Sequence, residues 1–65
     1  MVNKAQANYN MEFDNGKFQK EKKYRYREEN NKFFVITEEG KEQDFTCAEF
    51  NTFFTILKEN EKYNG

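Results

Sequence analysis

The chain has 65 residues, a net formal charge of −1, eight Phe, four Tyr, one Cys and no His. This length allows one domain, and a single cysteine without histidine excludes an internal disulfide and a zinc site. A domain this small buries only about 60% of the surface of its unfolded chain. We therefore expect the aromatic rings to supply the core, and self-association to a homodimer to add stability.

The N-terminal residues show no apolar pattern before Tyr9. Because Met1–Ala7 is polar, we predict a flexible arm over residues 1–8, one domain over residues 9–60 and a flexible tail over residues 61–65. The N-terminal segment also lacks the apolar run of a secretory signal or a membrane span. With the lone cysteine, this predicts a soluble protein of the bacterial cytoplasm that does not bind membranes. The composition suggests an AT-rich genome, such as that of a low-GC bacterium or its phages.

A hairpin is predicted at the start of the domain. Tyr9, Met11 and Phe13 alternate with polar residues, which is the period of a half-buried strand. The Asn15-Gly16 dipeptide then favours a type I′ turn, because that turn needs positive φ at both central residues.

The second predicted strand is long and runs from Phe18 to about Arg27. Tyr24 would share a face with Phe18, but Lys20 and Lys22 would share that face too. Because burying unpaired lysines is costly, we expect this strand to be bulged, or its first half to project from the sheet as a solvated ribbon.

The third predicted strand, Lys32–Thr37, follows an Asn-rich turn and is apolar on both faces. Phe33 and Val35 can face one layer, while Phe34 and Ile36 face another. Antiparallel strands of small domains usually keep one face in water. The second apolar face is therefore a candidate interface for a homodimer or a protein partner.

A capping box is the clearest local signal. It follows a turn at Glu38–Lys41 and a short strand at Glu42–Phe45, and it pairs the Thr46 hydroxyl with the Glu49 carboxylate around the first turn of a helix. Phe45, the last residue of that strand, and Phe50 have the spacing of a hydrophobic staple.

The helix is predicted to continue to about Asn60. Phe50, Phe53, Phe54 and Leu57 have the i, i+3, i+4, i+7 spacing of one helix face. The predicted fold class is therefore α+β, an antiparallel β-meander of three to four strands followed by one C-terminal amphipathic helix.

Catalytic chemistry has few candidates. The chain has no His or Ser, so the usual general base and hydroxyl nucleophile are missing. Cys47 has no imidazole to activate it and fits a small core residue better. The acid pairs Glu28-Glu29 and Glu38-Glu39 are predicted at hairpin tips, without the spacing of a calcium loop. We predict a protein that is not an enzyme, with no cofactor, metal or small-molecule substrate.

Charge is divided unevenly along the chain. Residues 17–27 carry six Lys or Arg against one Glu, a net +5, and residues 28–49 carry seven acids against two Lys, a net −5. Such asymmetry bears on partners rather than on fold.

The basic segment predicts a nucleic-acid-binding module, with single-stranded DNA or RNA favoured. Cations neutralise phosphates and interleaved aromatic rings can stack on unpaired bases. Cationic side chains on an exposed edge strand can instead prevent edge-to-edge pairing, and this second interpretation stays open. The candidate binding residues are Lys20, Lys22, Lys23, Tyr24, Arg25, Tyr26 and Arg27.

The layout resembles the positive-cofactor family of transcriptional coactivators. The resemblance rests on Tyr9–Phe13, on the strand that ends Tyr24-Arg25-Tyr26, and on Gly40–Phe50 running into a helix. It implies a dimer that binds single-stranded DNA on a β-ribbon. The family has an apolar alternating strand where this chain has Gln19–Lys23.

Residues 24–37, an acidic-turn hairpin, and 45–50, which run into a helix, are similar to small phage inhibitors of uracil-DNA glycosylase. That resemblance implies an acidic DNA mimic that binds a host enzyme through an aromatic residue at the helix start. The matching residues are Glu28, Glu29, Glu38, Glu39, Glu42 and Phe50. The staple spacing also gives Phe50 a core role, and the +5 segment has no counterpart in such mimics.

Overall fold

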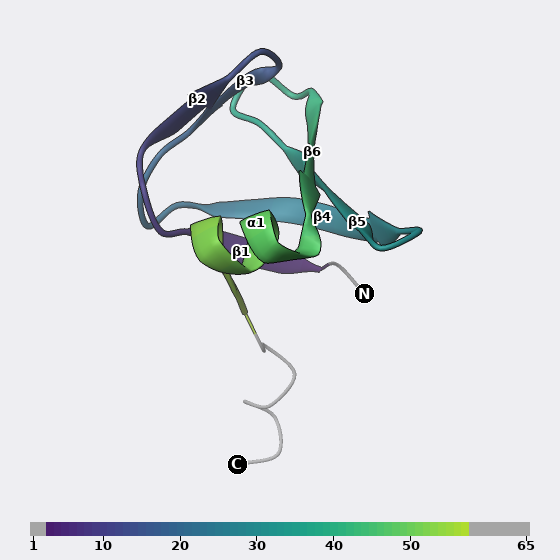
Figure 1. Ribbon diagram of the computed structural model, residues 1–65. Helices are drawn as coiled ribbons and strands as arrows, with labels where there is room; N and C mark the ends of the chain where they lie inside the picture. Colours follow the sequence, from purple (N-terminus) through teal and green to yellow (C-terminus); the bar gives the residue numbers. More distant parts are fainter. Residues whose placement is uncertain (1–2, 58–65) are drawn as a thin grey trace.

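The computed structural model describes residues 3–57, which form a small α+β fold of antiparallel strands with one short helix near its C-terminal end (Figure 1). The elements are β1 Lys4–Ala7, β2 Met11–Phe13, β3 Gly16–Phe18, β4 Lys23–Glu29, β5 Lys32–Ile36, β6 Glu42–Thr46, α1 Cys47–Phe53 and β7 Phe54–Ile56.

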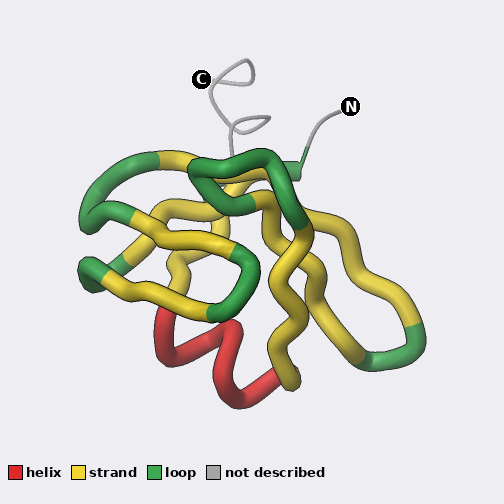
Figure 2. The backbone as a smooth tube through the Cα atoms, turned by 90° about the horizontal axis from the view of Figure 1, so that it is seen from above, coloured by secondary structure: helices red, strands yellow, loops and turns green. Residues whose placement is uncertain are grey.

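Five of the strands form one antiparallel sheet in the order β6-β5-β4-β1-β7. The hairpin β2–β3 is a separate sheet of two strands, and Figure 1 shows β6 turning away from β4 and climbing toward it. In the view from above, the helix lies along one side of the described part of the chain, and strands with their connecting loops make up the rest (Figure 2). The core lies between this hairpin, the helix and the inner face of the sheet.

Strand β1 contradicts the predicted N-terminal arm. Lys4–Ala7 lies between β4 and β7, with Ala5 opposite Tyr24 on one side and Ile56 on the other. Ala5 and Ala7 are fully buried. Alanine is depleted in strands, but here two small side chains let bulky rings approach the sheet from inside. Residues 1–2 of the predicted arm lie outside the described residues, as does the predicted tail over residues 61–65.

The predicted long strand is also wrong, because it is broken into β3 and β4. The connecting residues 19–22 include Glu21 with φ of 72°, a left-handed conformation that ends a strand. The break removes the problem of inward lysines, since Lys20 and Lys22 are exposed in the connection. Strand β4 is then neither a projecting ribbon nor an edge strand, because it pairs with β1 and β5.

The predicted hairpin turns form, with one change of geometry. Asn30 and Asn31 both have positive φ between β4 and β5, as the Asn-rich turn predicts. In the first hairpin Phe13 is opposite Gly16, so the turn residues are Asp14 and Asn15. Only Gly16 has positive φ there, 137°, so the expected type I′ turn on Asn15-Gly16 is not the one adopted.

The helix starts as predicted but is much shorter. Thr46 is its N-cap, and the Glu49 N–H donates to the Thr46 hydroxyl at 3.1 Å while the Thr46 N–H donates to the Glu49 carboxylate at 3.0 Å. The helix ends at Phe53, and Phe54–Ile56 pairs with β1 as β7. Its predicted extension over residues 58–60 lies outside the described part of the chain. No helix among residues 3–57 is long and apolar enough to cross a membrane.

The chain leaves the helix because its next residues favour a strand. Phe, Thr and Ile are residues that pack well on a pleated surface, and β1 offers them a free edge on which to pair. A seven-residue helix gains little from propensity alone. Tertiary pairing therefore overrides the helical spacing of Phe53, Phe54 and Leu57.

Aromatic rings fill the core. Phe33 and Phe50 stack in parallel with ring centroids 4.0 Å apart, and Phe18 contacts Tyr24 and Phe54 edge to face at 4.9 and 5.1 Å. Such pairs each add about 0.5–1.5 kcal/mol beyond the area that they bury. The aromatic core that composition predicts is therefore confirmed.

The hairpin β2–β3 is fastened to the sheet by polar contacts at Thr37. This buried hydroxyl donates to the Asn15 carbonyl at 2.9 Å and accepts from the N–H groups of Glu39 and Lys41. The Lys17 N–H donates to the Glu39 carboxylate at 3.0 Å. These bonds hold the hairpin over the core and close the inner side of the sheet.

Candidate nucleic-acid interface

Strand β4 presents its basic residues on the outer face of the sheet. Lys23, Arg25 and Arg27 are exposed, while Tyr24 is buried and Tyr26 half-buried between them. The alternation follows from the two-residue period of a strand. The three cations therefore share one face of the strand.

A neighbouring strand adds a fourth cation. Lys4 of β1 lies opposite Arg25, so the two side chains share the outer face, and Gln6 likewise lies opposite Lys23. Lys4, Lys23 and Arg25 make no ion pair within residues 3–57. We call these three residues the outer basic patch. Sequence analysis missed Lys4 because the strand that positions it was read as an arm.

Acidic residues on this face are already paired. Glu29 and Glu42 both bind Arg27, and Asp44 binds Lys32 at 3.6 Å. Arg27 and Lys32 offset two of these three negative charges, and the three cations of the outer basic patch leave the face with a net positive charge. A positively charged surface of this kind attracts phosphate groups.

Arg27 is held rigidly across the face. Its Nε donates to Glu42 Oε2 at 2.8 Å and its Nη2 to Glu42 Oε1 at 3.1 Å, while Nη1 donates to Glu29. These bonds raise the pKa of Arg27 and lower that of Glu42. The guanidinium carbon lies 4.3 Å from the centroid of the Phe34 ring, in cation–π contact.

A shallow hollow of about 220 Å³ lies beside this arginine. Its floor is apolar, because Phe34 and Ile36 are the half-buried outer residues of β5. The second apolar face predicted for this strand is thus present. The lining residues are Arg25, Tyr26, Arg27, Phe34, Ile36 and Glu42.

The remaining predicted cations lie in the connection before β4. Lys20 and Lys22 are exposed, and the Lys22 ammonium is 3.7 Å from a carboxylate oxygen of Glu38. The Lys20 N–H donates to the Asn10 side chain at 2.8 Å, which fixes the backbone while leaving its ammonium outward. Lys20 is therefore an exposed cation in the connection before β4.

The two tyrosines of the basic segment are not available as stacking platforms. Tyr24 is 8% exposed, and its hydroxyl donates to Glu38 at 2.6 Å and accepts from the Gln19 N–H at 2.7 Å. Burial, followed by the bond to Glu38, raises the pKa of Tyr24 to about 12. Tyr26 packs inward on Phe33 and Phe50, and its pKa is raised by burial and then by Glu28. The predicted stacking role of both residues is wrong, because the strand period turns them into the core.

Among the residues matched to the glycosylase inhibitors, Glu29 and Glu42 meet at Arg27, but the two acid pairs are not brought together. Glu28 and Glu29 lie at one end of β5, and Glu38 and Glu39 lie beyond its other end, about 17 Å away for a strand of five residues. Glu38 and Glu39 are engaged in bonds that hold the core and the hairpin. Phe50 is fully buried, so its core role is confirmed and its partner contact is wrong.

Cys47 differs from its expected place in the core. It is exposed at the first position of the helix, and its thiol donates to the Asn31 carbonyl at 3.6 Å. The short helix explains this, since only Phe50 among its residues is buried. A lone exposed thiol without a base defines no catalytic site.

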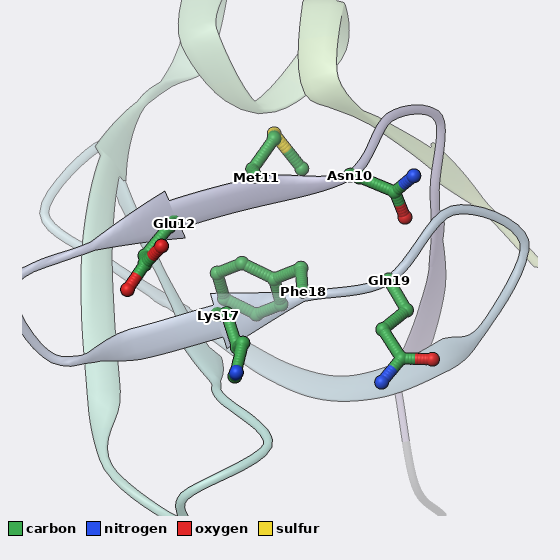
Figure 3. Close-up of a pocket in the computed structure, with 6 residues that line it drawn as sticks. All are labelled: Asn10, Met11, Glu12, Lys17, Phe18 and Gln19. Carbon is green, nitrogen blue, oxygen red and sulfur yellow. The ribbon is translucent and has the colours of Figure 1, made fainter.

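A second pocket of about 330 Å³ lies along the β2–β3 hairpin (Figure 3). Met11 points toward the helix, while Glu12 and Lys17 lie opposite each other across the hairpin and point away from it. Phe18, at its centre, is only 1% exposed. The opposite charges of Glu12 and Lys17 offset each other in this pocket, and its aromatic ring, Phe18, is not accessible to a ligand. The outer face is the stronger candidate.

Comparison with known proteins gives no match. No family model matches the chain, and searches of curated proteins and of solved structures found no match either. The two resemblances noted in the sequence remain expectations. The function of this chain is therefore argued from its own residues.

Proposed function

We propose that this protein is a non-catalytic binding module for single-stranded nucleic acid, and that the strand lies on the outer face of the sheet. The observation that carries this proposal is the set of unpaired cations on adjacent strands, Lys4, Lys23 and Arg25. Cations that neutralise phosphates release counterions, which supplies most of the affinity for a nucleic-acid backbone.

The surrounding charges support this assignment. The acids on the same face are bound to Arg27 and Lys32, and the described residues of this face carry more cations than acids. The net charge of −1 for the whole chain makes this a local attraction. We expect modest affinity and steep salt dependence rather than general coating of DNA.

A fluorescence anisotropy titration with labelled DNA and RNA single strands and duplexes tests the proposal. Three phosphate contacts on a single strand give a slope of about −2 for log K against log salt. Lys23→Gln with Arg25→Gln should weaken binding strongly at low salt and reduce the slope by about 1.4. Lys41→Gln removes an exposed lysine from the β5–β6 turn and is the matched control. Absence of binding to every strand at low salt would overturn the proposal.

A protein partner on the same face is the second candidate. The observation that favours it is the half-buried apolar pair Phe34 and Ile36 on an outer surface. It predicts a stoichiometric complex from bacterial lysate that persists in Lys23→Gln/Arg25→Gln and is lost in Phe34→Glu. A homodimer through this face would show the same dependence on Phe34 in sedimentation measurements.

A further inference from the structure

Arg27 forms a flat, fixed surface at the centre of the outer face. Three of its nitrogens donate to Glu42 and Glu29, so the guanidinium has little freedom to rotate. Its guanidinium carbon lies over the Phe34 ring, 4.3 Å from the ring centroid.

The hollow beside Arg27 combines three features. Its floor is apolar at Phe34 and Ile36, its wall contains the fixed guanidinium, and its rim carries the unpaired Arg25. Flat bases stack both on aromatic rings and on arginine planes. A cation beside the stacking surface is placed to meet the phosphate of the same nucleotide.

We infer that this hollow binds one unpaired nucleobase, stacked on the open face of the Arg27 guanidinium, while Arg25 contacts a phosphate of the bound strand. The inference rests on the proposed function, and it names the element that distinguishes single strands from duplexes. In a duplex the base faces are already stacked within the helix, so only a single strand can insert one. The stack is then Phe34, Arg27 and base in order.

Charge favours a nucleotide over an apolar side chain of a protein as the occupant. The hollow is lined by two guanidinium groups and the Glu42 carboxylate; Glu42 pairs with Arg27, and Arg25 lacks an ion-pair partner within the described residues. An apolar side chain would cover the floor and leave this charge desolvated without compensation. A nucleotide covers the Arg27 guanidinium with its base and offsets the charge of Arg25 with its phosphate.

The test compares oligothymidylate with an abasic oligonucleotide of equal length and charge, at low salt. The folded protein should bind oligothymidylate roughly tenfold more tightly, in line with the stacking of one base. Arg27→Lys keeps the charge but removes the plane, and Phe34→Leu removes the supporting ring. Both should bring the two affinities together while binding of the abasic strand stays within about twofold. Lys41→Gln, at an exposed lysine of the β5–β6 turn, is the control and should preserve the preference.

The outcomes separate this inference from the proposed function. Equal affinity of the unaltered protein for both oligonucleotides would overturn the base site and leave phosphate binding standing. A preference for oligothymidylate that survives Arg27→Lys and Phe34→Leu would place the base elsewhere and also overturn it. No binding to either strand would overturn both proposals. Thermal melts of each variant, followed by circular dichroism, establish that the fold is retained.

Discussion

The two faces of strands β4 and β5 are built from alternate residues of the same segments and have opposite roles. On the inner face Tyr24, Phe33 and Val35 are buried, with Val35 fully so. On the outer face Arg25 is exposed and Phe34 half-buried, beside cations that lack partners within the described residues. The inner face holds the fold together, and the outer face carries the features suited to binding.

This difference shows how a basic-aromatic sequence should be interpreted on a strand. Tyrosines and cations that alternate in the sequence are separated by the thickness of the sheet once the strand forms. The aromatic group available beside the cations comes instead from the next strand, as Phe34 shows. Interleaving would place the two kinds of side chain together only on a loop or a free ribbon.

The largest expected change in stability is at one of two neighbouring phenylalanines, Phe33 and Phe34, which lie on opposite faces of β5. Phe33→Ala removes a ring that stacks on Phe50 at 4.0 Å and should cost about 3–5 kcal/mol of unfolding free energy. Phe34→Ala truncates a half-exposed ring and should cost about 1 kcal/mol. Urea denaturation of both variants measures the difference. Equal losses would show that the outer face is as much a part of the core as the inner face.

The next effect concerns the hairpin that closes the inner face. Gly16 has φ of 137°, and a Cβ there would lie 2.4 Å from the Thr37 hydroxyl and 2.3 Å from the Glu39 carboxylate. We expect Gly16→Ala to cost about 2–3 kcal/mol through clash and strain. Gly40→Ala is the matched control, because Gly40 has φ of 87° but nothing within 4 Å of its Cβ position. Thermal melts giving equal losses for the two would contradict the role of this contact.

The sequence predicted the elements whose signals are local. The capping box at Thr46–Glu49 and the turn at Asn30-Asn31 need only neighbouring residues, and both form as expected. The two-sided apolar pattern of residues 33–36 also correctly placed Phe34 on an outer face.

The errors arise where a distant partner decides the outcome. Lys4–Ala7 becomes a strand because β4 and β7 lie on either side of it, and alanine gives no local signal for that. Phe54–Ile56 likewise forms a strand because it pairs with β1, although its sequence has the spacing of a helix. For the candidate site, the sequence found the cations of β4 but missed Lys4 and the brace between Arg27 and Glu42, since both depend on strand order.

A smaller effect on stability should appear at alkaline pH, and it arises from Tyr24 on the inner face. The pKa of Tyr24 is raised from 10 to about 12, so its proton is bound more tightly in the folded state. The stability that this provides is complete below pH 10 and is lost as the pH rises through about 12. Tyr24→Phe should lose about 1 kcal/mol at neutral pH and show a shallower decline above pH 10. Tyr9→Phe, at an exposed tyrosine, is the control and should follow the unaltered protein.

The smallest effect on stability should come from the ion pair between Arg27 and Glu42 on the outer face. Arg27 lowers the pKa of Glu42 below its ordinary value of 4.5, so the folded state binds this proton less tightly. The resulting stability is present above that ordinary value and is lost as the pH falls through the lowered one. Glu42→Gln should therefore melt slightly below the unaltered protein at neutral pH, and the two should converge in acid. Glu28→Gln, at a residue without an ion pair among the described residues, should not change the acid limb. Because the brace is exposed to solvent, its contribution is screened by salt, and a large loss in Glu42→Gln would mean that the outer face holds the fold and is not free to bind a strand.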